Sequence, residues 1–337
     1  MLKAVDVGFG RVKALNGEQI TFPSVVGDFR PVRFTSGMEG KNWAERICVD
    51  YNGEQYFIGD IAFQQSHARV TMNSERFTDD EGMVLMLTAL MFLAEEKQET
   101  IKLVTGLPVS EYALRRDAYE KALLGDHEIY SISLDGTVID TYNFEIEEVK
   151  ILPQPVGSIF DAVLGEEGEL VKRETAAGKI GVLDIGRNTV DMARTDALSF
   201  VDRQSTSFDD IGIEDVHKEL SLELKARLGV SIPPENLEYY IQKGKIKYKG
   251  ETVDMEDEIE TVLESQAEKI FSRVLNNWKD FWELDKIIIT GGGAAIMGDY
   301  IADAINSPGQ VELYDGSQAT FSNVSGYLKF AKRAWCE

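Results

Sequence analysis

Two short segments, one near the start of the chain and one near its middle, combine an acid and glycine in the same order. The first reads Val5-Asp6-Val7-Gly8-Phe9-Gly10-Arg11-Val12-Lys13, and the second reads Leu183-Asp184-Ile185-Gly186-Arg187-Asn188-Thr189-Val190-Asp191. In each, an apolar stretch typical of a buried strand ends in an aspartate, and a glycine turn follows. Glycine lets backbone N–H groups approach an anion closely, while the carboxylate can hold a cation. The pattern predicts two phosphate-facing hairpins that together could bind one phosphate chain and its Mg²⁺.

A third glycine-rich turn, Gly291-Gly292-Gly293, follows the apolar stretch 286–290 and precedes a helix expected from about Gly298. Three glycines that open a helix suit the close approach of a nucleotide, although they also fit a plain tight turn. Asp-x-Gly is likewise a common turn when it occurs once. Two copies after apolar strands, half a chain apart, favour a nucleotide-binding interpretation over a purely structural one.

The composition excludes several other kinds of function. The chain has 337 residues, with 35 Lys and Arg against 58 Asp and Glu, and a formal charge of −23. This length is enough for about two domains. Such an acidic chain repels phosphate backbones, so direct nucleic-acid binding is not expected unless a local basic patch exists. Cys48 and Cys336 are too few for a disulfide framework, and the three histidines have no metal-ligand spacing.

No targeting or membrane segment is expected. Asp6 places a charge where a signal peptide would need an apolar core. The longest apolar stretch, Met83–Ala94, is shorter than the roughly 20 residues that span a bilayer. We therefore predict a soluble, cytoplasmic protein.

Strands, helices and glycine turns alternate along the sequence, which predicts an α/β protein with partly parallel sheets. The expected strands are 2–7, 11–16, 19–22, 101–105, 129–134, 138–144, 146–152, 180–185 and 286–290. The expected helices are 83–94, 111–124, 156–164 and 257–282. The first of these helices is apolar nearly all round, so it should be buried between layers. The polar stretch 28–60 should form an irregular, partly β insertion, and 166–179 a surface loop.

In combination, these segments resemble the superfamily of actins, hexokinases and DnaK-type chaperones. Three segments are similar to the two phosphate loops and the adenosine motif of actins, in that order: Asp6-x-Gly8-x-Gly10-x-x-Lys13, Asp184-x-Gly186-x-x-Thr189-x-Asp191 and Ile287-Ile288-Ile289-Thr290-Gly291-Gly292-Gly293-Ala294. Two more, Leu152-Pro153-Gln154-Pro155 and Gly326-Tyr327, fall where the family has its interdomain connecting helices. The resemblance covers nearly the whole chain.

The resemblance implies an actin-like fold, with two duplicated ribonuclease-H-like α/β domains around a nucleotide cleft. Domain I would comprise 1–153 plus about 323–337, with a small insertion at about 28–80. Domain II would comprise 154–322, with a helical insertion at about 215–282.

A narrower likeness lies in 104–112, where Gly106-Leu107-Pro108 is expected to form a strand-to-helix turn. This segment is similar to the Gly-Leu-Pro segment of ParM/StbA-type proteins, the bacterial actin-like ATPases that segregate plasmids, and archaeal actin-like proteins share part of it. The resemblance implies a nucleotide-dependent, filament-forming ATPase. It would bind further copies of itself head to tail and move plasmid DNA through a DNA-binding adaptor protein, with no direct contact to nucleic acid or membrane.

The resemblance also assigns roles to residues. Gln154 would orient the attacking water, Asp184 would act beside it, and Asp6 and Asp184 would hold Mg²⁺ through water. The expected nucleotide-binding residues are Gly8, Phe9, Gly10, Lys13, Gly186, Arg187, Asn188, Lys225, Gly291, Gly292, Gly293 and Ala294. The nucleotide would be ATP, with GTP left open.

Two positions depart from the family pattern. Phe9 stands where actins carry a small hydroxyl residue, and Arg187-Asn188 replaces residues that are usually small. The contact to the γ-phosphate is therefore open. Arg187 could be an added phosphate clamp or a solvated turn residue.

Two alternative functions are weighed against this one. A sugar or acetate kinase of the same superfamily would need a second substrate pocket with a catalytic base, for which the sequence offers no candidate. A membrane-tethered cytoskeletal or pilus-assembly homologue could use 327–335, with Lys329, Lys332 and Arg333, as a basic amphipathic tether. The same segment fits the second connecting helix better.

Overall fold

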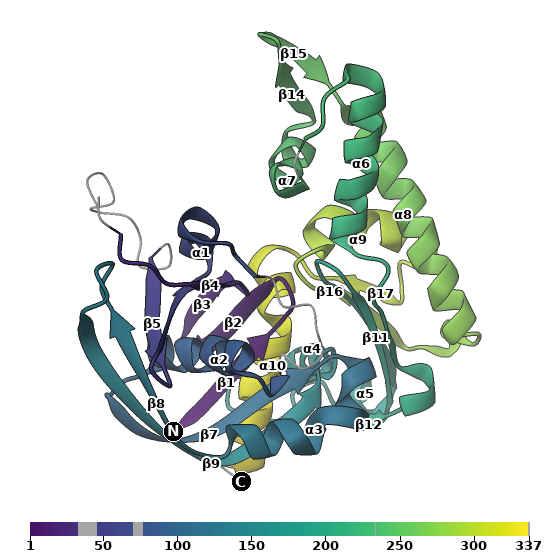
Figure 1. Ribbon diagram of the computed structural model, residues 1–337. Coiled ribbons are helices and arrows are strands. Elements are labelled where there is room, and N and C mark those ends of the chain that lie inside the picture. Colours follow the sequence, from purple (N-terminus) through teal and green to yellow (C-terminus); the bar gives the residue numbers. More distant parts are fainter. Residues whose placement is uncertain (33–45, 70–76, 233, 336–337) are drawn as a thin grey trace. The chain divides into compact units, whose positions relative to one another are not determined.

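The computed structural model describes residues 1–32, 46–69, 77–232 and 234–335 (Figure 1). Part of the predicted insertion 28–80 and Cys336 lie outside these residues. Contacts group the chain into two units, Met1–Arg173 with Phe321–Glu337 and Glu174–Thr320.

The first unit is built on a nine-stranded sheet with the order β3-β2-β1-β7-β9-β8-β5-β6-β4. Its strands are β1 (Leu2–Val7), β2 (Arg11–Asn16), β3 (Glu18–Pro23), β4 (Val26–Asp28), β5 (Ile47–Tyr51), β6 (Glu54–Ile58), β7 (Gln98–Leu107), β8 (Gly125–Ile132) and β9 (Val138–Pro153). β1, β7 and β9 run parallel, and the other neighbours are antiparallel. The carboxyl ends of the three parallel strands therefore share one edge of the sheet, where ligands of α/β proteins commonly bind.

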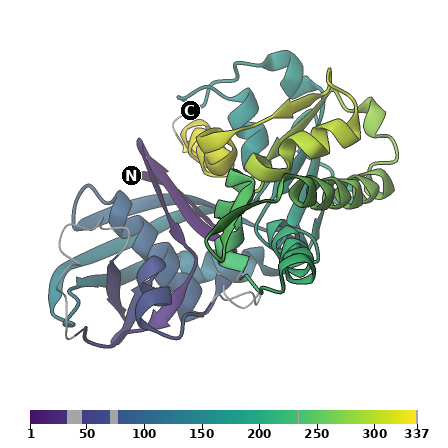
Figure 2. The same cartoon turned by 90° about the horizontal axis from the view of Figure 1, so that it is seen from above.

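Helices cover both faces of this sheet (Figures 1 and 2). α2 (Asp80–Leu93) packs on β1, β2, β3 and β8, and it is buried almost all round, as its sequence predicted. α10 (Gly316–Trp335) packs on the opposite face through Tyr327 and Ala331, which join a core cluster with Ala4 and Val104. The unit also contains α1 (Asp60–Gln65), α3 (Val109–Leu123) and α4 (Val156–Val163), and α5 (Arg173–Ala177) follows at its boundary.

The basic residues near the end of α10 contact protein. Lys329 Nζ lies 2.9 Å from Asp161 Oδ1, and Lys332 Nζ lies 3.2 Å from Glu167 Oε1. Arg333 donates to the Gly168 carbonyl. The segment is therefore a helix packed on the first unit, as expected of a connecting helix. None of the helices in the described part of the chain combines the length and apolar character needed to cross a bilayer.

The second unit repeats the central arrangement of the first. Its six-stranded sheet has the order β12-β11-β10-β16-β17, with β13 also paired to β11. The strands are β10 (Lys179–Ile185), β11 (Val190–Asp196), β12 (Ser199–Phe200), β13 (Thr206–Phe208), β16 (Lys286–Thr290) and β17 (Val311–Leu313). β10 is antiparallel to β11 and parallel to β16, as β1 is to β2 and β7. The expected duplication is confirmed.

The helices of this unit are α6 (Ile213–Leu228), α7 (Pro234–Lys243), α8 (Glu256–Asn277) and α9 (Ala294–Ile305). α8 packs on α6 and α9, and α9 packs on β16 and β17. A hairpin of β14 (Lys245–Tyr248) and β15 (Glu251–Asp254) contacts α7 through β14.

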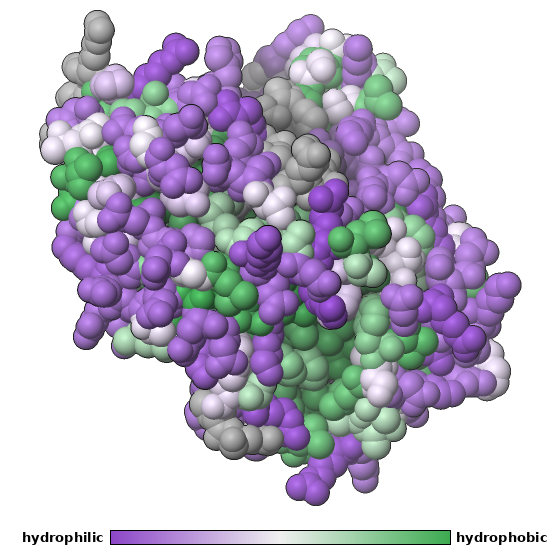
Figure 3. Space-filling view, turned by 60° about the horizontal axis from the view of Figure 1, so that its bottom comes forward, coloured by the Kyte–Doolittle hydropathy of each residue, from purple (hydrophilic) through white to green (hydrophobic). Residues whose placement is uncertain are grey.

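The hydrophilic side chains that predominate on the face drawn in Figure 3 are in keeping with a charged fraction of 28%.

Several expected elements differ in the structure. The strands expected at 138–144 and 146–152 are one strand, β9, because no turn residue separates them and β7 pairs with it across the junction. The helix expected to reach 282 ends at Asn277, because the next residue, Trp278, is fully buried and its indole N–H donates to the Gln204 carbonyl.

The other differences concern short elements. α9 begins at Ala294, directly after the glycine triplet, rather than near Gly298. The loop expected at 166–179 contains α5. The insertion expected to be helical at 215–282 includes the β14–β15 hairpin. Its turn residues Lys249 and Gly250 have φ of 49° and 90°, the pair of positive values that defines a type I′ turn.

Candidate nucleotide-binding site

The first predicted phosphate loop is the turn between β1 and β2. The Gly8 N–H donates to the Arg11 carbonyl at 3.1 Å, and a Cβ on Gly8 would lie 3.0 Å from that oxygen. Ser24, which is 2% exposed, donates its hydroxyl to the Gly8 carbonyl at 2.6 Å and its N–H to the Gly10 carbonyl at 3.1 Å. Ser24 thus fixes two carbonyls of the turn. Ser24 is not among the residues predicted from the sequence, because it stands outside every motif.

Three predicted residues of the first unit are in direct contact. Asp6, at the end of β1, is 1% exposed and accepts hydrogen bonds from Lys13 Nζ at 3.2 Å and Gln154 Nε2 at 2.9 Å. Gln154, which directly follows β9, is 7% exposed. A buried carboxylate is stable only with such partners. The parallel strands therefore bring a charged cluster together from sequence positions far apart.

The Gly-Leu-Pro segment supports this cluster. β7 ends at Leu107 and Pro108 caps α3, so the segment is the predicted strand-to-helix turn. A Cβ on Gly106 would lie 2.0 Å from the Tyr327 hydroxyl and 2.9 Å from Gln154 Cγ. The Tyr327 hydroxyl donates to the Gln154 carbonyl at 3.2 Å. Only glycine leaves room for this contact, so the motif has a steric role beside Gln154.

The second predicted phosphate loop, between β10 and β11, has the same local geometry as the first. The Gly186 N–H donates to the Thr189 carbonyl at 2.8 Å, and a Cβ on Gly186 would lie 3.0 Å from that oxygen. Asp184 pairs with Asp191 across the strands, as Asp6 pairs with Lys13 in the first hairpin. Asp191 is 4% exposed and accepts from the Thr189 and Ser207 hydroxyls.

The start of α6 lies directly on the second loop. The Ile213 and Glu214 N–H groups donate to the Gly186 and Arg187 carbonyls at 3.3 and 2.8 Å. Arg187 Nε donates to Glu214 Oε2 at 3.2 Å, and its side chain is 40% exposed. Asn188 Oδ1 is buried and has no hydrogen-bond partner among the described residues. In this structure Arg187 is a turn residue paired with a carboxylate.

The glycine triplet packs on the end of β10. A Cβ on Gly291 would lie 2.2 Å from Asp184 Oδ1, and its φ of 92° also favours glycine. The Gly293 N–H donates to the Ile185 carbonyl at 2.8 Å. A Cβ on Gly292 would meet no atom within 4 Å. Asp184 and the triplet are therefore neighbours, with open space beside Gly292.

The remaining predicted residues are less closely connected. Phe9 is partly buried in the first loop, and Ala294 is buried at the start of α9. Lys225 is exposed near the end of α6. It stands twelve residues after Ile213, or ~18 Å along the helix axis. The structure does not join Lys225 to the loop.

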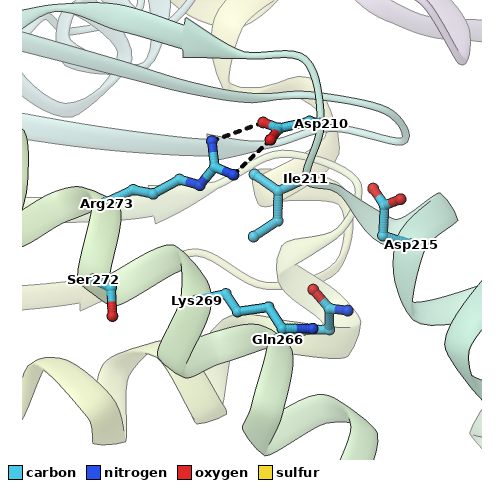
Figure 4. A pocket seen from close by; sticks show the side chains of 7 residues that line it. All are labelled: Asp210, Ile211, Asp215, Gln266, Lys269, Ser272 and Arg273. Atoms are coloured by element: carbon cyan, nitrogen blue, oxygen red, sulfur yellow. Dashed lines mark hydrogen bonds and ion pairs between the residues drawn. The ribbon is translucent and has the colours of Figure 1, made fainter.

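A hollow of about 420 Å³ in the second unit lies beside the start of α6 (Figure 4). It is lined by Asp210, Ile211, Asp215, Gln266, Lys269, Ser272 and Arg273. Arg273 donates two hydrogen bonds to Asp210, at 2.7 and 2.6 Å, and holds the pKa of this carboxyl below its usual range. Lys269 lies 3.2 Å from Glu219 Oε2. Because acids hold both basic side chains, the hollow is not a preformed anion site.

Residues 4–157 match the family model described as the N-terminal domain of actin-like proteins, and residues 182–303 match that of the C-terminal domain of the archaeal MreB-like actin homologue. A comparison with curated protein sequences gave no match. Together with the duplicated sheets, the two domain matches show that the chain belongs to the actin-like proteins.

Solved structures extend the likeness to nearly the whole chain. The archaeal actin homologue Ta0583 has a TM-score of 0.81 at 21% identity, covering 99% of both chains, and it has also been solved in complex with ADP. A ParM from a 15-stranded filament of Clostridium botulinum has a TM-score of 0.76 at 22% identity, covering 98% of this chain and 99% of that one. Bacillus thuringiensis ParM with AMPPNP has a TM-score of 0.71 at 18% identity, covering 97% of each chain.

Proposed function

We propose that this chain is an actin-like ATPase that polymerises when it binds nucleotide. The observation that carries the proposal is the repeated hairpin. In both units an aspartate is the last residue but one of the central strand, and a glycine N–H closes the following turn on the carbonyl three residues later. The complexes of similar proteins with ADP and AMPPNP, and the ParM filament, support the proposal.

The two loops would bind the phosphates of one nucleotide. Backbone N–H groups of 9–10 and 187–188 would donate to phosphate oxygens, and Lys13 would add a positive charge. Gly291, Gly292 and Gly293 would lie against the nucleoside, where the lack of side chains permits close approach.

Magnesium fits the donor set. Asp6 accepts one protein hydrogen bond on each carboxylate oxygen, and each oxygen has a second lone pair that can accept from a metal-bound water. Mg²⁺ keeps several waters and needs only one or two carboxylates beside the phosphates, so Asp6 and Asp184 suffice without a cluster of protein ligands. When bound, Mg²⁺ would neutralise charge on the phosphates.

Gln154 would orient the water that attacks the γ-phosphate. Its Nε2 donates to Asp6, which fixes the amide plane and leaves Oε1 as an acceptor for a water proton. Asp184, at the matching strand end of the second unit, would act beside that water. Positioning of this kind is the main protein contribution to phosphoryl transfer.

The biological role would be plasmid segregation. A head-to-tail contact that does not close into a ring yields an open filament. Because the chain has a net charge of −23, such a filament would hold DNA through a separate basic adaptor protein.

Light scattering at 90° tests the proposal, with the pure protein and Mg²⁺ plus ATP, GTP or neither. We expect scattering to rise only with nucleotide and to be followed by phosphate release. Asp6→Ala should remove both signals, while Asp117→Ala, on the exposed surface of α3, provides the control. Scattering that is the same with and without nucleotide, or that never rises, contradicts the proposal.

A further inference from the structure

The end of α7 and the β14–β15 hairpin that follows it carry an unusual concentration of positive charge for so acidic a chain. Lys243 ends α7, Lys245 and Lys247 stand on β14, and Lys249 is in the turn, whereas the whole chain has a formal charge of −23. We call these four residues the lysine hairpin. Within the second unit, the ribbon extends beyond the ends of the neighbouring helices α6 and α7 (Figure 1).

The two lysines of β14, Lys245 and Lys247, face solvent because of the strand period. Ile246 is 5% exposed and points to the side of the hairpin that packs on α7, so its neighbours Lys245 and Lys247 point to the other side. All four lysines are exposed. Lys245 Nζ lies 3.9 Å from Asp254, a loose pair, and Lys249 lies over the Tyr248 ring. Lys247 makes no ion pair with the described part of the chain.

The same unit carries a complementary surface. The exposed positions of α8 and α9 include six acids, Asp257, Glu260, Glu264, Glu268, Asp299 and Asp303, which we call the acidic stripe. The members on α8 are three or four residues apart, so they share one helix face. α9 packs directly on α8. Burial, followed by the charges of Glu260, Glu264 and Asp299, raises the pKa of Tyr300 between the two helices.

The two surfaces do not neutralise each other within one chain. No ion pair joins the lysine hairpin to the acidic stripe among the described residues, and the stripe has no ion pair with any lysine or arginine there. A nucleic acid would fit the hairpin poorly, because Glu251 and Asp254 on β15 would meet its phosphates. A protein face can place a few separate acids opposite the lysines and away from Glu251 and Asp254, which a continuous row of phosphates cannot do.

We infer that the lysine hairpin of one copy docks on the acidic stripe of a second copy. The contact joins different surfaces of the two copies, so a pair of copies still exposes one lysine hairpin and one acidic stripe. Further copies can therefore add at both ends. The inference rests on the proposed filament and assigns one of its contacts to the second unit. Opposite charges facing each other would set the register of the contact and speed association.

Charge exchange tests this contact. Two double variants, Lys245→Glu/Lys247→Glu and Glu260→Lys/Glu264→Lys, each make like charges face each other across the contact. In each of them, the protein concentration needed for nucleotide-dependent pelleting should rise about ten-fold or more. The chain with all four substitutions restores opposite charges and should polymerise near the wild-type concentration. Lys121→Glu/Lys172→Glu, at exposed sites of the first unit, is the control and should behave as wild type.

Binding of a fluorescent nucleotide separates the possible failures. All variants should bind it like wild type. If wild type binds nucleotide but never polymerises, both the filament and this contact are wrong. If wild type polymerises and either reversed pair does so equally well, or the four-fold variant is not rescued, the contact alone is wrong.

Discussion

At the scale of single residues, Gln154 donates a hydrogen bond to Asp6, and substituting it should affect nucleotide hydrolysis and nucleotide binding differently. Gln154→Ala removes the group proposed to orient water but leaves the turn hydrogen bonds of the two predicted phosphate loops in place. We expect turnover to fall by roughly ten- to a thousand-fold, as for the loss of one positioning group, with little change in nucleotide affinity. Filaments should form and persist. Phosphate release at the wild-type rate within filaments would show that another group, such as Asp184 or Asn188, holds the water.

Substitution of Gly106 should disturb both Tyr327 and Gln154, which lie against it. In Gly106→Ala, the new methyl would overlap the Tyr327 hydroxyl, 2.0 Å from the Cβ position, and push on Gln154. Overpacking of this kind typically costs about 1–3 kcal/mol. We expect a lower melting temperature and slower hydrolysis.

Tyr327→Phe supplies the matched test for Gly106→Ala. It removes the overlapping oxygen and the hydrogen bond to the Gln154 carbonyl. Adding it to Gly106→Ala should recover part of the lost stability, whereas Tyr314→Phe, at another buried tyrosine, should not. Equal stability of the two double variants would contradict the steric explanation.

The candidate residues could be predicted from the sequence, but most of their contacts could not. Asp6, Gly8 and Gly186 belong to local patterns of acid and glycine, and each of the two glycines forms the predicted turn. Three of the contacts join segments from different parts of the sequence: Ser24 with Gly8, Tyr327 with Gln154, and Gly291 with Asp184. Such contacts depend on strand order and register, which no single segment encodes.

Strands and helices could be predicted where the apolar pattern and a turn residue mark the same boundary. The strands at 2–7, 11–16 and 286–290 match the structure to the residue, because a glycine directly follows each of them and ends the strand. The β14–β15 hairpin was missed since its four-residue strands are polar and lie between helical patterns. The end of α8 was misplaced because Trp278 and Trp282 continue its apolar spacing beyond the last helical turn.

α6 contains a buried titratable group that should make stability depend on pH. His217 is 4% exposed, and neither ring nitrogen has a hydrogen-bond partner among the described residues. Burial lowers its pKa, although Glu214 and Glu238 act in the opposite direction and Arg187 adds to the lowering. The unfolded chain, with a histidine pKa near 6.5, then takes up a proton before the folded chain does. The stability from neutral His217 is thus present above that pKa and lost as pH falls below it.

Denaturant unfolding at pH 7.5 and 5.5 measures this loss. We expect His217→Leu to reduce the difference between the two pH values by up to about 1.4 kcal/mol per pH unit below 6.5. His127→Gln controls for the loss of any one histidine. The same difference in His217→Leu and wild type would contradict the assignment.

At the scale of the whole molecule, duplication and charge have separate consequences. Because the sheets are duplicated, each unit has one loop with the same turn hydrogen bond, and each loop would supply part of the proposed phosphate site. The charge of −23 acts over the whole surface and determines which partners can approach. The lysine hairpin is the local exception, and its neighbours Glu251 and Asp254 limit it to partners that present discrete acids.

Duplex DNA should therefore bind the isolated protein negligibly at physiological salt. Non-specific affinity for DNA comes from lysine and arginine contacts to several consecutive phosphates. The hairpin offers four lysines at most, and the Debye length of about 8 Å leaves the acids beside them unscreened. Fluorescence anisotropy with a labelled duplex should show no binding at micromolar protein, with or without nucleotide. Lowering the salt should not create tight binding, because it strengthens the repulsion by the net charge as well as the attraction by the hairpin. Sub-micromolar affinity without an adaptor, lost in Lys245→Glu/Lys247→Glu, would instead make the hairpin a DNA contact.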